Sequence, residues 1–203
     1  MRLCSSVLML VLVMSGSAFA QESAVVGVKG GVNFANLNFE GEEATINFDN
    51  RTGFVGGLFV VWPAASRVSL HTEFLYSQKG ATVEEGSESG KVKIDYFDVP
   101  VLLRASSPAS ANGTSFHAFA GPSFAFRVSA ETESSFDGEE ESEDIDDEVE
   151  RFDLGLVVGA GVRFGRFEID GRYTWGLSDL NKIEGEELKI RNRVFSVMAG
   201  IRF

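Results

Sequence analysis

The chain has 203 residues, which fits a single domain. Its formal net charge of -12 and pI of about 4.6 argue against nucleic acid as a partner. The 22 glycines and 18 phenylalanines, against only 4 prolines, favour close-packed strands with girdles of aromatic side chains over helices.

The first 20 residues have the pattern of a secretory signal peptide. Arg2 gives a positive start, residues 3–14 form an apolar core, and Ala18-Phe19-Ala20 is a small-x-small cleavage site. The pattern predicts export, with residues 21–203 as the mature domain. No later run reaches 18 apolar residues, so we expect any membrane crossing to be made by strands.

The only cysteine, Cys4, lies inside the predicted signal peptide. It precedes the apolar core, which does not suit a lipoprotein attachment site. We therefore expect the mature chain to carry neither a thiol nor a disulfide.

Eight later segments alternate apolar and polar side chains with the two-residue period of a strand. The last segment shows it well, because its odd positions from Phe195 to Phe203 are apolar while its even positions are mostly small or polar. The predicted strands are 26–37, 52–62, 68–79, 91–105, 116–128, 152–164, 167–177 and 191–203.

The fourth of these segments breaks the pattern. Ile94 and Tyr96 share a parity with Asp98, whereas Phe97 and Leu103 hold the other parity. One face cannot be both lipid-facing and polar. The sequence predicts either a bulge near Tyr96 or a strand whose upper part stands beyond the lipid.

The connections alternate in length, as they do in an up-and-down barrel whose two ends lie on the same side of the membrane. Transmembrane barrels keep their long loops outside the cell, so we expect four outer loops and three inner turns. The predicted loops are 38–50, 82–90, 131–150 and 178–189, and the predicted turns are 63–66, 106–114 and 165–166.

These features predict an all-β fold: an eight-stranded antiparallel up-and-down transmembrane β-barrel in the outer membrane of a diderm bacterium. Expected partners are outer-membrane lipid, lipopolysaccharide, and the barrel-assembly machinery, which would engage the closing strand that ends in Phe203. A soluble calycin-like barrel is the alternative, and it would need its apolar parity to point inward.

An eight-stranded barrel has an interior only just wide enough for side chains. Charges there must pair, since an unpaired buried charge is costly. The sequence therefore favours a salt-bridged plug, and a narrow path for ions or small solutes is the alternative. The predicted lumen charges are Lys29, Glu73, Arg127, Asp153, Arg163, Glu168, Asp170, Arg172 and Arg202, together with Lys79, and Asp98 and Arg104 as possible additions.

The remaining candidate sites favour structural roles, so we predict no enzymatic, cofactor or metal site. His71 and His117 come early in strands that leave the short turns, away from the outer rim where barrel enzymes act. The acidic run from Glu139 to Glu150 is typical of a solvated, mobile loop. It lacks the glycine and distal glutamate of a calcium loop, although loose binding of divalent ions is possible.

Five blocks of sequence resemble the outer membrane protein β-barrel domain, or PorT-like porin, family of Bacteroidetes and their relatives. This resemblance covers the mature chain and implies a barrel, without an assigned activity for most members. It also leaves open a role as a component of a secretion machine, beside the readings as a surface protein or a diffusion pore. The blocks are 27–35 (GVKGGVNFA), 73–80 (EFLYSQKG), 95–103 (DYFDVPVLL), 119–123 (FAGPS) and 192–196 (NRVFS).

Overall fold

The computed structural model describes residues 24–40, 49–85, 88–136, 139–144, 150–178 and 189–203. The predicted signal peptide lies outside these ranges. Within them, no helix has the length and apolar character needed to cross a membrane. The elements are β1 (Val25–Glu40), β2 (Asp49–Ala65), β3 (Val68–Glu85), β4 (Glu88–Ser106), β5 (Thr114–Phe136), β6 (Glu139–Asp144), β7 (Phe152–Phe164), β8 (Phe167–Gly176) and β9 (Lys189–Arg202).

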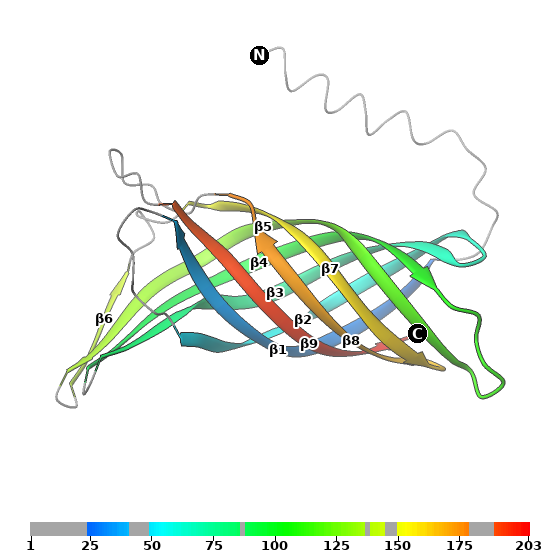
Figure 1. Cartoon of the computed structure of the whole chain (residues 1–203), viewed down its shortest axis with the longest axis horizontal. Coiled ribbons are helices and arrows are strands. Elements are labelled where there is room, and N and C mark those ends of the chain that lie inside the picture. The colour runs from blue at the N-terminus through cyan, green and yellow to red at the C-terminus, as the bar shows by residue number, and fades with distance from the viewer. Residues whose placement is uncertain (1–23, 41–48, 86–87, 137–138, 145–149, 179–188) are drawn as a thin grey trace, which may run out of the picture.

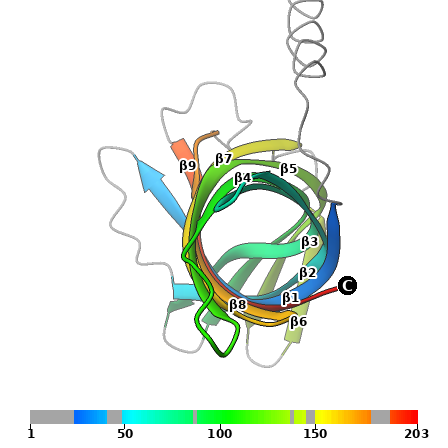
Figure 2. The same ribbon diagram turned by 90° about the vertical axis from the view of Figure 1, so that its right-hand side faces the viewer.

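Eight of these strands close into one antiparallel barrel. Each strand pairs with the next along the chain, except that β5 pairs with β7, and β9 pairs with β1 to complete the ring. Figure 2 shows the closed ring from one end. The ninth strand, β6, pairs with the far end of β5 only, among the described strands. The prediction of an eight-stranded antiparallel barrel is confirmed.

The two faces of the barrel wall follow the predicted parity. Large apolar side chains such as Leu58, Phe116 and Ile169 are exposed on the outside, while charged side chains such as Glu73 and Glu168 are buried inside. A soluble barrel of the calycin type would have the opposite arrangement, so that alternative is wrong.

The apolar wall has the height of an outer-membrane barrel. On β1 it runs from Val26 to Phe34, and on β5 from Phe116 to Val128. At about 3.3 Å per residue and a tilt near 40°, these spans correspond to roughly 20 and roughly 30 Å along the barrel axis. They bracket the apolar band of about 25 Å that such barrels present to lipid.

Close approach of backbones explains part of the glycine content. A Cβ atom on Gly31 would lie 2.0 Å from the carbonyl oxygen of Val197, and one on Gly57 would lie 2.0 Å from that of Phe74. Any side chain at these two positions would collide with the neighbouring strand. The turn between β7 and β8 uses Gly165 in the left-handed region, with φ of +58°.

The predicted bulge exists, but it lies on β5 instead of on the fourth strand. Asp95 pairs with Ser129 and Tyr96 pairs with Arg127, so Val128 is the extra residue. β4 keeps one parity throughout, and Tyr96 and Asp98 both point inward. Tyr96 is buried, and its aromatic ring packs in an inner apolar cluster with Ile94, Ala125 and Ala130.

Several stretches predicted as loops are strands. β3 continues to Glu85 and β4 starts at Glu88, within the predicted loop 82–90, and β5 continues to Phe136 to pair with β6, within the predicted loop 131–150. These strands stand beyond the apolar wall, where both faces are free of lipid and no apolar period is required. At the first loop, β1 likewise extends to Glu40.

Figure 1 shows the result of these extensions: the paired ends of β3, β4, β5 and β6 reach past the rest of the barrel at one end. The C-terminus and the short turns lie at the other end. We call these the long-strand end and the short-turn end. The turns at 106–114 and 165–166 were predicted at their observed places, while the turn after β2 centres on Ser66 and Arg67 because β2 includes Ala65.

Candidate functional site: the barrel lumen

A cluster of seven charges, six of them buried and Arg202 partly buried, fills the lumen toward the short-turn end. Each side chain occupies an inward position of its strand, and together they come from five strands around the ring. We call this set the charge cluster. Its members are Lys29 on β1, Glu73 on β3, Arg104 on β4, Glu168, Asp170 and Arg172 on β8, and Arg202 on β9.

Arg172 joins opposite walls of the barrel. Its guanidinium group forms two parallel bonds to Glu73, with Nη1 to Oε2 at 2.6 Å and Nη2 to Oε1 at 3.1 Å. It also contacts Asp170 Oδ1, at 3.0 Å from Nη2 and 3.2 Å from Nε. Because β3 and β8 are four places apart in a ring of eight, this bidentate pair spans the full width of the lumen.

The remaining cations, Lys29, Arg104 and Arg202, hold the third carboxylate, Glu168, and Lys29 also contacts the first two. Lys29 Nζ lies 2.8 Å from Glu73 Oε1, 3.1 Å from Asp170 Oδ2 and 3.7 Å from Glu168 Oε1. Glu168 Oε2 accepts bonds from Arg104 Nη1 at 3.0 Å and from Arg202 Nη2 at 2.6 Å. The charge cluster therefore holds four cations and three carboxylates, each carboxylate with at least two cationic partners.

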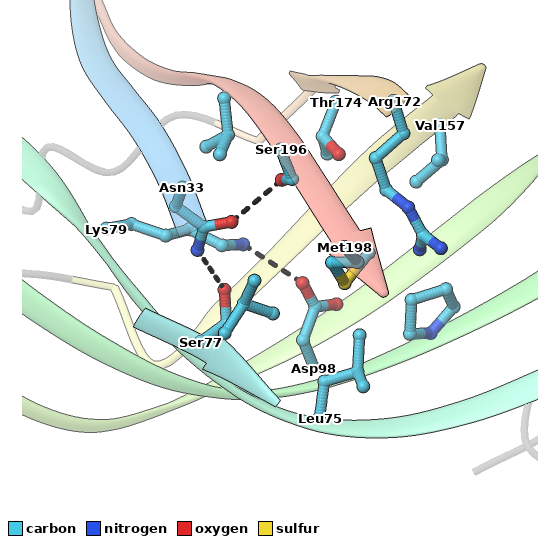
Figure 3. Close-up of a pocket in the computed structure, with 13 residues that line it drawn as sticks. Asn33, Leu75, Ser77, Lys79, Asp98, Val157, Arg172, Thr174, Ser196 and Met198 are labelled. Atoms are coloured by element: carbon cyan, nitrogen blue, oxygen red, sulfur yellow. Dashed lines mark hydrogen bonds and ion pairs between the residues drawn. The ribbon is translucent and has the colours of Figure 1, made fainter. Parts of the chain in front are cut away.

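A second polar layer lies farther toward the long-strand end. Lys79 Nζ pairs with Asp98 Oδ2 at 3.3 Å, and Ser123 donates a hydrogen bond to the other oxygen of Asp98. Asn33 Nδ2 donates to Ser77 Oγ at 2.9 Å, and Ser196 Oγ donates to Asn33 Oδ1 at 2.7 Å. These bonds link β9, β1 and β3 across the interior (Figure 3).

A small pocket separates the second layer from Arg172. Its volume is about 20 Å³, and Lys79, Asp98, Arg172, Ser196 and Met198 are among the residues that line it (Figure 3). A cavity of roughly 10–15 Å³ holds one water molecule. The pocket therefore has room for a water or a small ion, and it is too small for an organic solute.

The two histidines lie in the lumen and form no catalytic arrangement among the described residues. His117 Nδ1 lies 2.7 Å from Arg104 Nη2, and since the guanidinium group can only donate, Nδ1 must be the acceptor. His71 stacks on Phe59, with 6.3 Å between the ring centroids. No serine or carboxylate bonds to either imidazole ring within the described ranges.

The structure separates the predicted lumen residues into groups. Lys29, Glu73, Glu168, Asp170, Arg172 and Arg202 come together in the charge cluster, and the possible addition Arg104 joins them, while Lys79 and Asp98 form the second layer. Asp153 is buried beyond that layer. Arg127 and Arg163 are only half-buried, and Arg163 Nη1 donates to the Gly165 carbonyl oxygen at the short turn, at 3.3 Å.

The predicted lumen charges leave out several buried residues of the lumen that carry polar groups, and Asn192 and Tyr96 are two of them. Asn192 is buried near the start of β9, and Tyr96 is buried on β4. Asn192 shares the parity of the inward-facing Ser196 and Met198, so extending the period of the closing strand back from Phe195 by three residues would identify it. For Tyr96, the conflict of parities along the fourth predicted strand leaves its face undecided in the sequence.

A closed eight-stranded barrel with an apolar outside and a charged inside is the architecture of a transmembrane β-barrel. The family described as "Outer membrane protein beta-barrel domain" matches residues 19–182 of the sequence. The chain belongs to this family and is a small outer-membrane β-barrel protein. The match does not distinguish PorT-like members from other members. No curated protein matches the sequence.

Solved structures with similar folds are outer-membrane barrels. Ail of Yersinia pestis, solved with the heparin analogue sucrose octasulfate, is 17% identical, with 90% of this chain and 100% of that chain covered and a TM-score of 0.44. OprG of Pseudomonas aeruginosa is 12% identical, with 90% and 97% covered and a TM-score of 0.49. The outer membrane enzyme PagL is 11% identical, with 88% and 99% covered and a TM-score of 0.40. Similarity at this level gives no information on function.

Proposed function

We propose that the protein is a closed, non-conducting barrel of the outer membrane that acts through its outer wall and its projecting strands. The observation that carries this proposal is the bidentate bond between Arg172 and Glu73, which bridges opposite walls of the lumen. Lys29 donates a hydrogen bond to Glu73, Asp170 accepts one from Arg172, and both side chains fill the space beside the bridge.

Opening such a cluster to ions carries a large energetic cost. An ion that crosses must displace at least one partner of a buried pair, and breaking a buried pair by removing one partner costs about 3–5 kcal/mol. Water that could compensate has little space in an eight-stranded barrel. A plugged lumen leaves the surfaces of the barrel as the parts available for function.

The paired ends of β3, β4, β5 and β6, which we call the projecting sheet, form one such surface. Beyond the apolar wall, β4 extends over the nine residues from Glu88 to Tyr96, which at about 3.3 Å per residue and a tilt near 40° reach roughly 20 Å. Its outward side chains there include Lys91 and Lys93. We place this end outside the cell, with the short turns in the periplasm, because transmembrane barrels keep longer segments outside. Lipopolysaccharide is a proposed contact of this end.

A catalytic role is not part of the proposal. A histidine that acts as a base needs a nucleophile within hydrogen-bond reach, and both imidazole rings are packed inside the lumen. The Nε2 atoms of His71 and His117 have no hydrogen-bond partner among the described residues. Their contacts with Phe59, Phe119 and Arg104 suit a structural role in the wall of the plug.

Single-channel recording in planar lipid bilayers tests the proposal. Residues 21–203, refolded and inserted, are expected to give no steady conductance. The double variant Glu73→Ala/Arg172→Ala removes the bridge and is expected to conduct, whereas Glu131→Ala, which removes an exposed charge on β5, is expected to stay silent.

Steady conductance of the wild type would contradict the proposal and favour the diffusion pore. A silent wild type that purifies with a tightly bound protein partner would instead favour a component of a larger assembly, such as a secretion machine.

A further inference from the structure

Beyond the second polar layer, two buried oxygen atoms lack a donor. Asn192 Nδ2 donates to Asp153 Oδ2 at 2.7 Å and lies 3.3 Å from the hydroxyl oxygen of Tyr96. The other oxygen of each partner, Asp153 Oδ1 and Asn192 Oδ1, is buried with no hydrogen-bond partner in the described chain. Asp153 is 3% exposed and Asn192 is 1% exposed, so bulk water does not satisfy them.

The carboxylate of Asp153 also lacks a cationic partner. No ion pair within 4.0 Å joins it to a described residue. The nearby cation, Lys79, pairs with Asp98 at 3.3 Å, and its Nζ lies 4.6 Å from the centre of the Tyr96 ring. A buried carboxylate without compensation is costly, so a further positive charge in this part of the lumen would stabilise the folded barrel.

The backbone allows the side chains of Asp153 and Asn192 to lie close together. Asp153 on β7 and Asn192 on β9 are separated by β8, which ends at Gly176. A Cβ atom on Gly176 would lie 2.9 Å from both the backbone nitrogen and the backbone oxygen of Asn192. The absence of a side chain at Gly176 allows the carboxylate and the amide to meet over the end of β8.

We propose that Asp153 and Asn192 bind one monovalent metal cation, Na⁺ or K⁺, through their free side-chain oxygens. A hard cation prefers carboxylate and amide oxygens, and a single charge balances the single unpaired carboxylate. A divalent ion would require more acidic ligands. Within the described ranges, no group of three or more His, Cys, Asp or Glu side chains gathers to hold one. The site does not depend on whether the lumen conducts.

Thermal unfolding in matched salts tests the site. Residues 21–203 are refolded in micelles of an uncharged detergent and melted in NaCl or KCl, and in N-methyl-D-glucamine chloride at the same ionic strength and pH. Binding to the folded state alone stabilises it, so the wild type is expected to melt several degrees higher in at least one alkali salt. Asp153→Asn is expected to lose this difference. Glu131→Gln, which changes an exposed carboxylate on β5, is expected to keep it.

Three results would overturn the proposal. Equal melting of the wild type in all three salts would mean that water or a proton satisfies the two oxygens. If the melting temperature of Asp153→Asn still differs between the salts, the bound ion lies elsewhere, for example on other acidic side chains. If Asp153→Asn does not refold, Asn192→Ala replaces it: this variant should need several-fold more alkali cation for half of the shift, and an unchanged requirement would exclude Asn192 as a ligand.

Discussion

Replacing Arg172 by methionine removes the group that bridges the lumen while keeping a long side chain. The change leaves Glu73 and Asp170 without four hydrogen bonds. Breaking a buried ion pair by removing one partner costs about 3–5 kcal/mol. Lys29 remains 2.8 Å from Glu73 and 3.1 Å from Asp170, so we expect the lower end of this range, about 3 kcal/mol.

Urea unfolding of the protein refolded in lipid vesicles measures this cost, with the fluorescence of Trp62 and Trp175 as the signal. The double variant Arg172→Met/Glu73→Gln removes both partners of the bridge and is expected to be more stable than the sum of the two single changes predicts, by about 2 kcal/mol. Pairing Arg172→Met with the exposed change Glu131→Gln is the control, which should be additive within about 0.5 kcal/mol.

The reasoning would be refuted by a small cost of Arg172→Met, below about 1 kcal/mol, together with no coupling to Glu73→Gln. Values of that size are typical of exposed ion pairs. They would mean that water fills the lumen around these side chains and that the charge cluster does not close it.

Two further changes test the wall and the strand packing. Leu156→Arg places a charge on the lipid-facing side of β7 and should destabilise the barrel by roughly 2–4 kcal/mol, while the exposed Glu131→Arg should leave urea unfolding nearly unchanged; equal effects would show that the assignment of faces is wrong. Gly31→Ala places a Cβ atom 2.0 Å from the Val197 carbonyl oxygen and should prevent refolding by circular dichroism, whereas Gly90→Ala, with no heavy atom within 4 Å, should refold; refolding of both would contradict the close contact of β1 and β9.

Most of the barrel wall could be predicted from the sequence because lipid and lumen impose opposite demands on alternate residues. Between Phe152 and Phe164, every even position faces outward as the period predicts. Beyond the membrane this demand disappears, and the outer parts of β3, β4 and β5 carry no apolar period. Their strand structure follows from pairing with each other, which no local pattern reveals.

The bulge shows a different limit. The sequence shows a change of parity around Tyr96, yet the extra residue is Val128 on the neighbouring strand. A bulge is a property of a strand pair, because one strand gains a residue relative to the other. The sequence of one strand records the mismatch of faces without telling which strand carries the additional residue.

The parity of the strands predicts which charged residues face the lumen, but it does not predict which of them form ion pairs. Glu73 and Arg172 are 99 residues apart in sequence and face each other only because β3 and β8 lie on opposite walls at the same height. Height along the axis also decides exposure. Arg163 has the inward parity of Asp153, yet it lies next to the short turn and is half-buried. Strand order and stagger are needed to obtain these relations.

The bridge between Arg172 and Glu73 can be measured directly by solid-state NMR of the labelled protein in lipid bilayers. The experiment measures dipolar coupling between the guanidinium nitrogens of Arg172 and the carboxyl carbon of Glu73. A closed lumen predicts strong coupling, as expected for nitrogen-to-oxygen distances of 2.6 and 3.1 Å. Absence of coupling, with both side chains in contact with mobile water, would contradict a lumen closed by paired charges.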